Sequence, residues 1–332
     1  MIDDALFGTK LPRMQSRRCS DCATLQVRLR ALLLSLALVS ACERSRPVAR
    51  ADSSVVTATT RVDSSTHHGN SSGWDSGAGP ALLVQGATGD EAILLLPADD
   101  DRATAAYLDS TGGRTSTATL FGRGGARFSA RLGPAPTDDD PQCRLWPLRE
   151  IRTDGAATSW AIGFLGAQVA PLALDSVDVL TSRDSTALVA EVSRLASTVT
   201  ATTSASFQGL RFTAHDIRRF EATPGVQAIV AHLIRKVNQE ANPQEEQTLL
   251  IAERDSGVTS GPYQLAYAER TQGLEEEVTS PEVIAGVRLG ASQRPVLIVA
   301  RDGDDGVSYA MLERVEMHRW RVRWISRATR CG

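Results

Sequence analysis

A histidine beside a carboxylate is the pattern in this chain that comes closest to a catalytic site. His215 is followed directly by Asp216, and His232 lies further along the same middle region. An imidazole held near a carboxylate can serve as a general base. Because no nucleophile or orienting partner is identifiable for either histidine, both are interpreted as structural residues. We therefore assign no catalytic residue.

Carboxylate runs and paired histidines are the next candidates, because both residue types bind cations. Glu245-Glu246 and Glu275-Glu276-Glu277 lie in polar, loop-like stretches, and charge runs of this kind are usually solvated. His67-His68 can bind a metal weakly, but an isolated pair in a linker is usually just solvated. Asp302–Gly306 departs from the calcium-loop pattern at Gly306 and is better explained as a turn. The sequence thus predicts no metal and no cofactor.

Two glycine motifs match functional patterns only in their letters. Gly69–Gly73 fits G-x-S-x-G, but it lacks the strand before it and the helix after it that a nucleophile elbow needs. Gly122–Gly125 lacks the form of a phosphate-binding loop and is interpreted as a hairpin turn. Neither motif is assigned a function.

The last predicted strand carries the best surface candidate. In MHRWRVRWISR, the side chains of Arg319, Arg321 and Arg323 alternate with those of Trp320, Val322 and Trp324. A basic strand with aromatic neighbours can bind an anionic glycan, a lipid head group or a nucleic acid. The alternative is that the tryptophans enter the core while the arginines pair with acids or water.

An export signal precedes the folded part. Residues 28–42 read RLRALLLSLALVSAC, with two arginines before a nine-residue apolar run, Ala31–Val39, and small residues after it. This is the order of a secretory signal peptide. The apolar run is shorter than the roughly 20 residues needed to span a membrane. Residues 1–41 are therefore predicted to be the signal peptide, and Met14 offers an alternative start that would make 1–13 an extension.

The end of this signal, Val39-Ser40-Ala41-Cys42, resembles the lipobox of bacterial lipoproteins. The resemblance implies cleavage before Cys42, lipid on its thiol and anchoring by two or three acyl chains, palmitate among the possible ones. It leaves open an ordinary cleaved signal or an uncleaved membrane-proximal helix. Glu43, in place of an aspartate, favours the outer over the inner membrane. The expected location is the cell envelope, with the domain in the periplasm or at the surface.

The remaining cysteines are assigned by their compartment. Cys19 and Cys22 lie in the part that we expect to be removed, and Cys42 is assigned to lipid. Cys143 and Cys331 then form one pair, and an oxidising envelope compartment permits a disulfide bond between them. The alternative is two separately buried thiols.

Composition is ordinary for a globular protein, with 42% hydrophobic and 23% charged residues in 332. From Cys42 onward acids outnumber bases, which argues against nonspecific nucleic-acid binding. Residues 42–78 are rich in Ser, Thr, Asp and Gly and are predicted to be a flexible tether. Residues 79–332 are predicted to be globular, either as one unit or as subdomains 79–180 and 181–332.

Periodicity within the globular part predicts an α+β fold, mainly antiparallel sheet with two amphipathic helices packed on it. One helix is expected over Ser185–Val199 behind an Asp184 cap. The other is expected to start at Thr223-Pro224 and to stop near Asn242-Pro243. Each helix precedes a predicted strand, Leu210–Thr213 and Thr248–Glu253, which suggests a duplicated α–β unit. Further strands are predicted at Ala81–Gln85, Glu91–Leu96, Thr115–Phe121, Ala126–Leu132, Leu145–Ile151, Ser159–Leu165, Tyr263–Glu269, Pro295–Ala300, Val307–Leu312 and Trp320–Ile325, while Val283–Leu289 is left open between helix and strand.

These features favour a membrane-anchored envelope lipoprotein that acts as a non-catalytic binding or assembly module. Its expected partners are the membrane, through the lipid, and envelope proteins or glycans. The alternative is a cell-envelope hydrolase whose site assembles only in three dimensions, and a third reading is a spacer. A pocket that gathers His215 or His232 with acids and a serine would favour the enzyme, whereas a smooth surface with an arginine patch would favour binding.

Overall fold

The computed structural model describes residues 73–97, 116–135, 146–153, 159–199, 204–237, 242–255, 257 and 261–328. All of them belong to one compact unit, Val55–Gly332. They are mostly β-strands, and within them α2 (Ser182–Ser197) is the one helix of seven or more residues. The predicted α+β class with two amphipathic helices is therefore wrong, and the fold is a β-barrel joined to two sheets.

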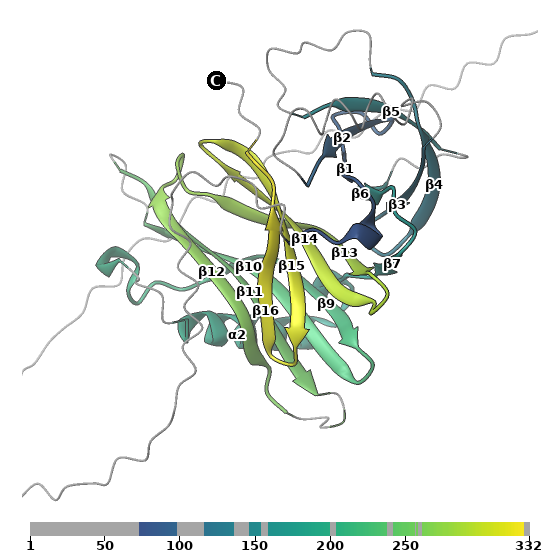
Figure 1. Ribbon diagram of the computed structural model, residues 1–332. Coiled ribbons are helices and arrows are strands. Elements are labelled where there is room, and N and C mark those ends of the chain that lie inside the picture. The colour runs from purple at the N-terminus through teal and green to yellow at the C-terminus, as the bar shows by residue number, and fades with distance from the viewer. Residues whose placement is uncertain are drawn as a thin grey trace, which may run out of the picture. The chain divides into compact units, whose positions relative to one another are not determined.

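The first part of the chain forms a closed antiparallel barrel, with strand order β1-β2-β5-β4-β3-β6 (Figure 1). Its strands are β1 (Leu82–Gln85), β2 (Glu91–Leu95), β3 (Thr117–Phe121), β4 (Arg127–Leu132), β5 (Leu148–Thr153) and β6 (Ile162–Phe164). The β1–β2 and β3–β4 pairings confirm both hairpins predicted from the sequence. Along β4, Ala130 and Leu132 are buried while Arg127, Ser129 and Arg131 are exposed, as the alternation predicts.

The second part forms two antiparallel sheets. One has the order β12-β11-β10-β9-β8 and the other β16-β15-β14-β13-β7. The first contains β8 (Asp175–Ser176), β9 (Thr213–Thr223), β10 (Val226–Val237), β11 (Gln244–Asp255) and β12 (Gln264–Leu274). The second contains β7 (Val169–Leu172), β13 (Ser280–Leu289), β14 (Arg294–Gly303), β15 (Gly306–Glu316) and β16 (Arg319–Ile325). Strands from 79–180 therefore contribute to both sheets.

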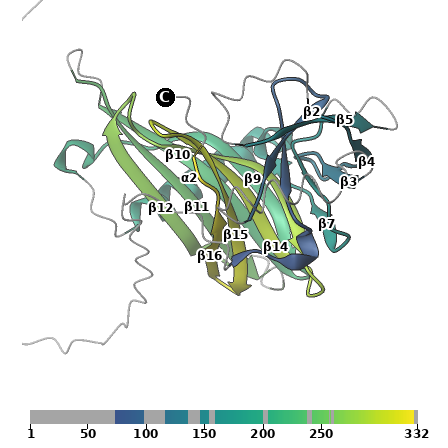
Figure 2. The same ribbon diagram turned by 45° about the horizontal axis from the view of Figure 1, so that its top comes forward.

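The two sheets pack face to face through a shared apolar core, and their long strands run as two layers (Figure 2). This core includes Phe220, Val230, Leu249 and Ile251 from one sheet and Val283, Leu297, Val299 and Leu312 from the other. Burying one face of each sheet in this way is the usual means of stabilising a β-sandwich.

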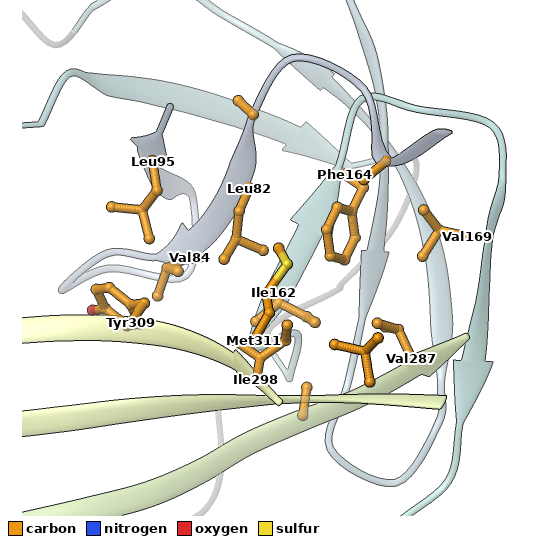
Figure 3. Packing of buried hydrophobic residues seen from close by; sticks show 14 of the residues in the cluster. Leu82, Val84, Leu95, Ile162, Phe164, Val169, Val287, Ile298, Tyr309 and Met311 are labelled. Atoms are coloured by element: carbon orange, nitrogen blue, oxygen red, sulfur yellow. The ribbon is translucent and has the colours of Figure 1, made fainter. Parts of the chain in front are cut away.

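The outer faces of the sandwich are also covered. On the β8–β12 sheet, α2 buries Leu188, Val192 and Leu195 against Ile229 and Ala231. This confirms the helix predicted over Ser185–Val199, although it starts earlier because Thr181 is the N-cap and accepts from the Asp184 amide. The β7–β16 sheet packs against the barrel, where Leu82, Val84, Ile162 and Phe164 face Val287, Ile298 and Met311 (Figure 3).

The second predicted helix is instead β10. Thr223-Pro224-Gly225 is the turn of the β9–β10 hairpin, with Gly225 at a φ of 82° that a turn position favours in glycine. Both faces of β10 are buried, one by β13–β16 and one by α2, so apolar residues occur without alternation. A continuous apolar strand and a buried helix cannot be separated by periodicity alone.

Two related predictions change with it. The strand expected at Leu210–Thr213 is wrong, because β9 begins only at Thr213 and continues to Thr223. The predicted duplication of an α–β unit is therefore wrong as well.

The segment Val283–Leu289, for which the sequence allows either a helix or a strand, is part of β13. Asp302–Gly306 is confirmed as the turn between β14 and β15.

Gly73–Ala78 packs against the sandwich. Trp74 contacts Trp324 of β16 edge-to-face at a centroid distance of 5.1 Å. Arg323 donates to the Gly73 carbonyl and pairs with Asp75 at 3.3 Å. This segment thus covers the end of the edge strand β16, which limits pairing of that edge with other chains.

Candidate functional site

An irregularity between β9 and β10 brings both middle-region histidines to one place. His232 pairs with Asp216, but the next residue, Leu233, pairs with Ala214, so His215 is an extra residue in β9. Such a β-bulge bends the strand and redirects a side chain. Without it, alternation would turn His215 toward α2. With it, His215 and His232 lie with their ring centroids 5.0 Å apart.

The histidines line a pocket of about 330 Å³ at the polar end of the space between the two sheets. Val230 and Val283, which also belong to the apolar core between the sheets, are among the residues that line it. The remaining lining residues are polar or come from segment ends: Arg123, Asp178, His215, Asp216, Arg218, His232, Ser280, Pro281 and Glu282. The pocket therefore draws on β9, β10 and β13, the β3–β4 turn and the short 3-10 helix η4 (Val177–Val179).

His232 is 5% exposed and is held by a chain of hydrogen bonds. Gln247 donates from Nε2 to Glu245 Oε1 at 2.9 Å, which leaves Gln247 Oε1 to accept. That oxygen contacts His232 Nε2 and accepts from Ser280 Oγ at 3.2 Å. Since Oε1 has no hydrogen to donate, the His232 proton lies on Nε2 and Nδ1 keeps its lone pair.

Burial lowers the pKa of His232 below its ordinary value. The hydrogen bond that His232 donates to Gln247 raises the pKa, the neighbouring His215 lowers it, and the charges of Asp216 and Glu245 raise it. The pKa of His232 is lowered overall, because desolvation, which disfavours the charged imidazolium, is the largest of these effects. His232 is therefore a neutral imidazole at neutral pH.

The charged side chains around the histidines pair with one another. Arg218 Nε contacts both Asp216 oxygens, at 2.9 and 3.0 Å. Arg123, from the β3–β4 turn, reaches the Ile284 carbonyl and pairs with Glu282 on β13. The pocket wall is thus rich in hydrogen-bonding groups without a strong excess of either charge.

A pocket that gathers a histidine, acids and a serine would favour an enzyme, and His215, His232, acids and Ser280 do line one pocket. However, the Ser280 hydroxyl donates to Gln247 and not to an imidazole. A serine nucleophile needs a hydrogen bond to its base. Within the described residues, no group of three or more His, Cys, Asp or Glu side chains is placed to hold a metal ion.

The arginine strip lies on the edge strand β16. Arg321 and Arg323 both contact Glu313, a fully buried carboxylate of β15, at 3.2 and 2.6 Å. Arg319 pairs with the exposed Glu316 at 2.9 Å. Trp320 and Trp324 are buried, so this strand has the alternation that the sequence indicated. Its arginines are ion-paired along the sheet.

The carboxylate run Glu245-Glu246 is not in a solvated loop. Both residues lie on β11 and are buried. Glu245 contacts Lys236 at 3.0 Å, and Glu246 pairs with Arg235 on the opposite face. The prediction of a solvated loop is wrong, because these acids stand at the start of a strand, before its apolar part. Glu275 to Glu277 do lie in the β12–β13 connection, as expected.

Gln247, which holds His232, and Ser280, which lines the pocket, are two residues that the sequence did not single out. No motif marks them, because they reach His232 only through the register of β11 and the packing of β13. The lipidation residue Cys42, the proposed disulfide Cys143–Cys331 and the signal peptide lie outside the described residues and stay predictions.

Comparison with known proteins gives no relative for this fold or pocket. No protein-family model matches the chain, and neither a curated protein nor a solved structure matches it. Among the described residues, no helix has both the length and the apolar character needed to cross a membrane.

Proposed function

We propose that this chain is a lipid-anchored envelope lipoprotein whose β-sandwich binds a small polar ligand in the pocket around His215 and His232. The lipobox-like Val39–Cys42 supports the anchor. The polar pocket supports the binding role. The protein is thus a binding module held at the membrane by its N-terminal lipid.

The observation that carries the binding role is the environment of His232. Its Nε2 is committed to Gln247, while no described residue hydrogen-bonds to Nδ1. The ring lines the pocket, so an acceptor on a fixed, neutral imidazole is available to a ligand there. Among the described residues, Nδ1 is not one of the fully buried side-chain atoms that lack a partner, so it is open to the pocket and can accept a hydrogen bond from a ligand.

The size and charge of the pocket limit the ligand further. A volume of about 330 Å³ is small for a ligand site. Arg218 and Arg123 are already paired with Asp216 and Glu282, so the pocket does not require a strongly charged ligand. Histidine is the sole aromatic residue type in the lining, which makes stacking on a large ring a minor contribution.

A hydrolase is the second candidate, because the pocket does gather two histidines, acids and a serine. In that case His232 would act as the base for Ser280. Their shared acceptor, Gln247 Oε1, would have to release the hydroxyl. Ester cleavage by the wild type that is lost in Ser280→Ala, with pocket binding retained, would favour the enzyme.

A thermal-shift comparison tests the binding role. The small-molecule fraction of the native envelope is added to purified wild type and to Ser280→Trp, in which an indole fills the pocket. We expect the wild-type Tm to rise and that of Ser280→Trp to stay constant, since a ligand that binds only the native state stabilises it. Glu276→Trp, on the exposed β12–β13 connection, is the matched control and should behave as wild type. An equal response of Ser280→Trp and wild type would contradict the proposal.

A further inference from the structure

We propose that His215 and His232 together chelate a divalent transition-metal ion in the pocket, with the other coordination positions left to water or a ligand donor. This inference rests on the proposed function, because it names the class of ligand that the same pocket takes. Imidazole nitrogen suits zinc, copper and nickel, whereas magnesium and calcium prefer oxygen. The ion would be held between adjacent strands β9 and β10.

The distance between the two rings fits this role. Two imidazoles that bind one tetrahedral zinc at about 2.0–2.1 Å place their centroids roughly 5 Å apart. The centroids of His215 and His232 are 5.0 Å apart, with an angle of 72° between the ring planes. His215 is exposed, so its ring can rotate to turn a nitrogen toward His232 without disturbing the core. The bulge is what places both rings on this side of the sheet.

The surroundings of His232 have the form that metal-binding histidines need. A ligand histidine usually donates its other N–H to a carbonyl or carboxylate, which fixes its tautomer and orientation. Here Nε2 donates to the Gln247 amide oxygen, and Gln247 is itself held by Glu245 at 2.9 Å. The lone pair is thereby fixed on Nδ1.

The chain supplies two ligands and leaves the site open. Asp216, the nearest carboxylate along β9, has both oxygens in contact with Arg218. No described residue completes a set of three protein ligands. The remaining positions face a pocket large enough for water and for a small donor. An open site of this kind favours reversible metal binding and capture of a metal-bound ligand over a closed structural role.

Calorimetric titration of Zn²⁺ into the purified full-length protein tests this proposal. His67-His68 is a second candidate pair in the same chain, so it is removed in a matched double variant, His67→Gln/His68→Gln. We expect that variant to bind one Zn²⁺ as the wild type does. His215→Gln and His232→Gln should lose the site, with affinity falling more than about 100-fold, and Gln247→Leu should weaken it about 10–100-fold.

His215→Gln is the decisive variant, because an exposed side chain can be replaced without loss of folding, which circular dichroism checks. Zn²⁺ affinity that is unchanged in His215→Gln overturns the proposal, as does the absence of binding by the wild type. Loss of binding in the His67→Gln/His68→Gln variant alone would assign the metal to that pair instead.

The two proposals fail separately. If Zn²⁺ does not bind but the envelope fraction still raises the Tm of wild type and not of Ser280→Trp, the pocket binds another ligand class and only the metal inference is wrong. If neither binds, the proposed function is wrong as well.

Discussion

His232 on β10 lies directly opposite Asp216 on β9, although the following residue of β10, Leu233, pairs with Ala214, two positions before Asp216. The extra residue between these pairs is His215. Because His215 is an inserted residue, its side chain lies on the opposite face from the one that regular alternation would give. A single β-bulge thus makes this end of β9 part of the pocket wall. The candidate site therefore depends on the bulge more than on any sequence motif.

Deleting His215 should remove the bulge and leave the fold intact. Asp216 faces the other sheet and Ala214 faces α2, so the shortened strand would alternate regularly. We expect the free energy of unfolding to change by no more than about 1 kcal/mol. Urea unfolding measures this change in the free energy of unfolding. The NMR chemical shifts of the β10 amides should indicate regular hydrogen bonding between β9 and β10.

Deletion of Ile217 is the matched control. That deletion shifts the register by one residue within a regular stretch and exchanges the faces of the neighbouring side chains. It should prevent folding. If deletion of His215 unfolds the domain as completely as deletion of Ile217, the bulge account is wrong.

Glu253→Ala should be among the most destabilising substitutions in the sandwich. Glu253 is fully buried and accepts from Arg314 at 2.7 and 3.1 Å and from Trp320 Nε1 at 2.6 Å. Its removal leaves the largely buried Arg314 without its counter-charge, which costs about 3–5 kcal/mol. Denaturant unfolding measures the loss, and the double variant Glu253→Leu/Arg314→Met should recover most of it.

Glu316→Ala provides the exposed counterpart from the other sheet of the sandwich. Glu316 and Arg319 form a 2.9 Å ion pair whose side chains are 63% and 61% exposed. Such pairs contribute about 0–1 kcal/mol. Equal losses for Glu253→Ala and Glu316→Ala would show that burial does not decide the contribution of these pairs.

Tyr267 should make the domain sensitive to alkaline pH. Burial raises the pKa of its hydroxyl far above the ordinary value, and the charge of Glu269 raises it further, against Arg301. Above pH about 10 the unfolded chain loses this proton while the folded protein keeps it, so stability falls as pH rises. The expected slope is about 1.4 kcal/mol per pH unit.

The comparison is with Tyr267→Phe, which lacks the ionising group. Urea midpoints between pH 8 and 11 should show that the stability advantage of wild type over Tyr267→Phe shrinks above pH 10. A difference that stays constant across this range would argue against a buried, protonated Tyr267.

The proposed lipid anchor predicts covalent labelling at one cysteine. Cells grown with a fatty-acid analogue should label the wild type but not Cys42→Ala, because only that thiol follows the lipobox-like sequence. Cys143→Ala keeps Cys42 and should label as wild type does. Equal labelling of Cys42→Ala and wild type would rule out the anchor.

Local patterns predicted the barrel hairpins and also the sandwich strands β11, β12, β14, β15 and β16, but they failed at β10. In the barrel, short strands alternate and end at glycine-rich turns, so β3 and β4 could be read directly. In the sandwich, β10 is covered on both faces and loses the alternation that distinguishes a strand. Thr223-Pro224 has the residues of a helix start, but Gly225 at positive φ makes this segment a turn.

The pocket could be predicted only in part. The sequence singled out His215 and His232, but not that a bulge brings them together. It gave no signal for Gln247, because a glutamine within a strand matches no motif, and its role follows from hydrogen bonds on both sides. Pairing between strands distant in sequence is decided by packing of the whole sheet.

Native mass spectrometry of the protein extracted from its own membrane tests the pocket most directly. Wild type should carry, besides the acyl mass, a noncovalent mass that Ser280→Trp lacks and that Glu276→Trp retains. Identical masses for wild type and Ser280→Trp, with both folded, would contradict a ligand in the pocket.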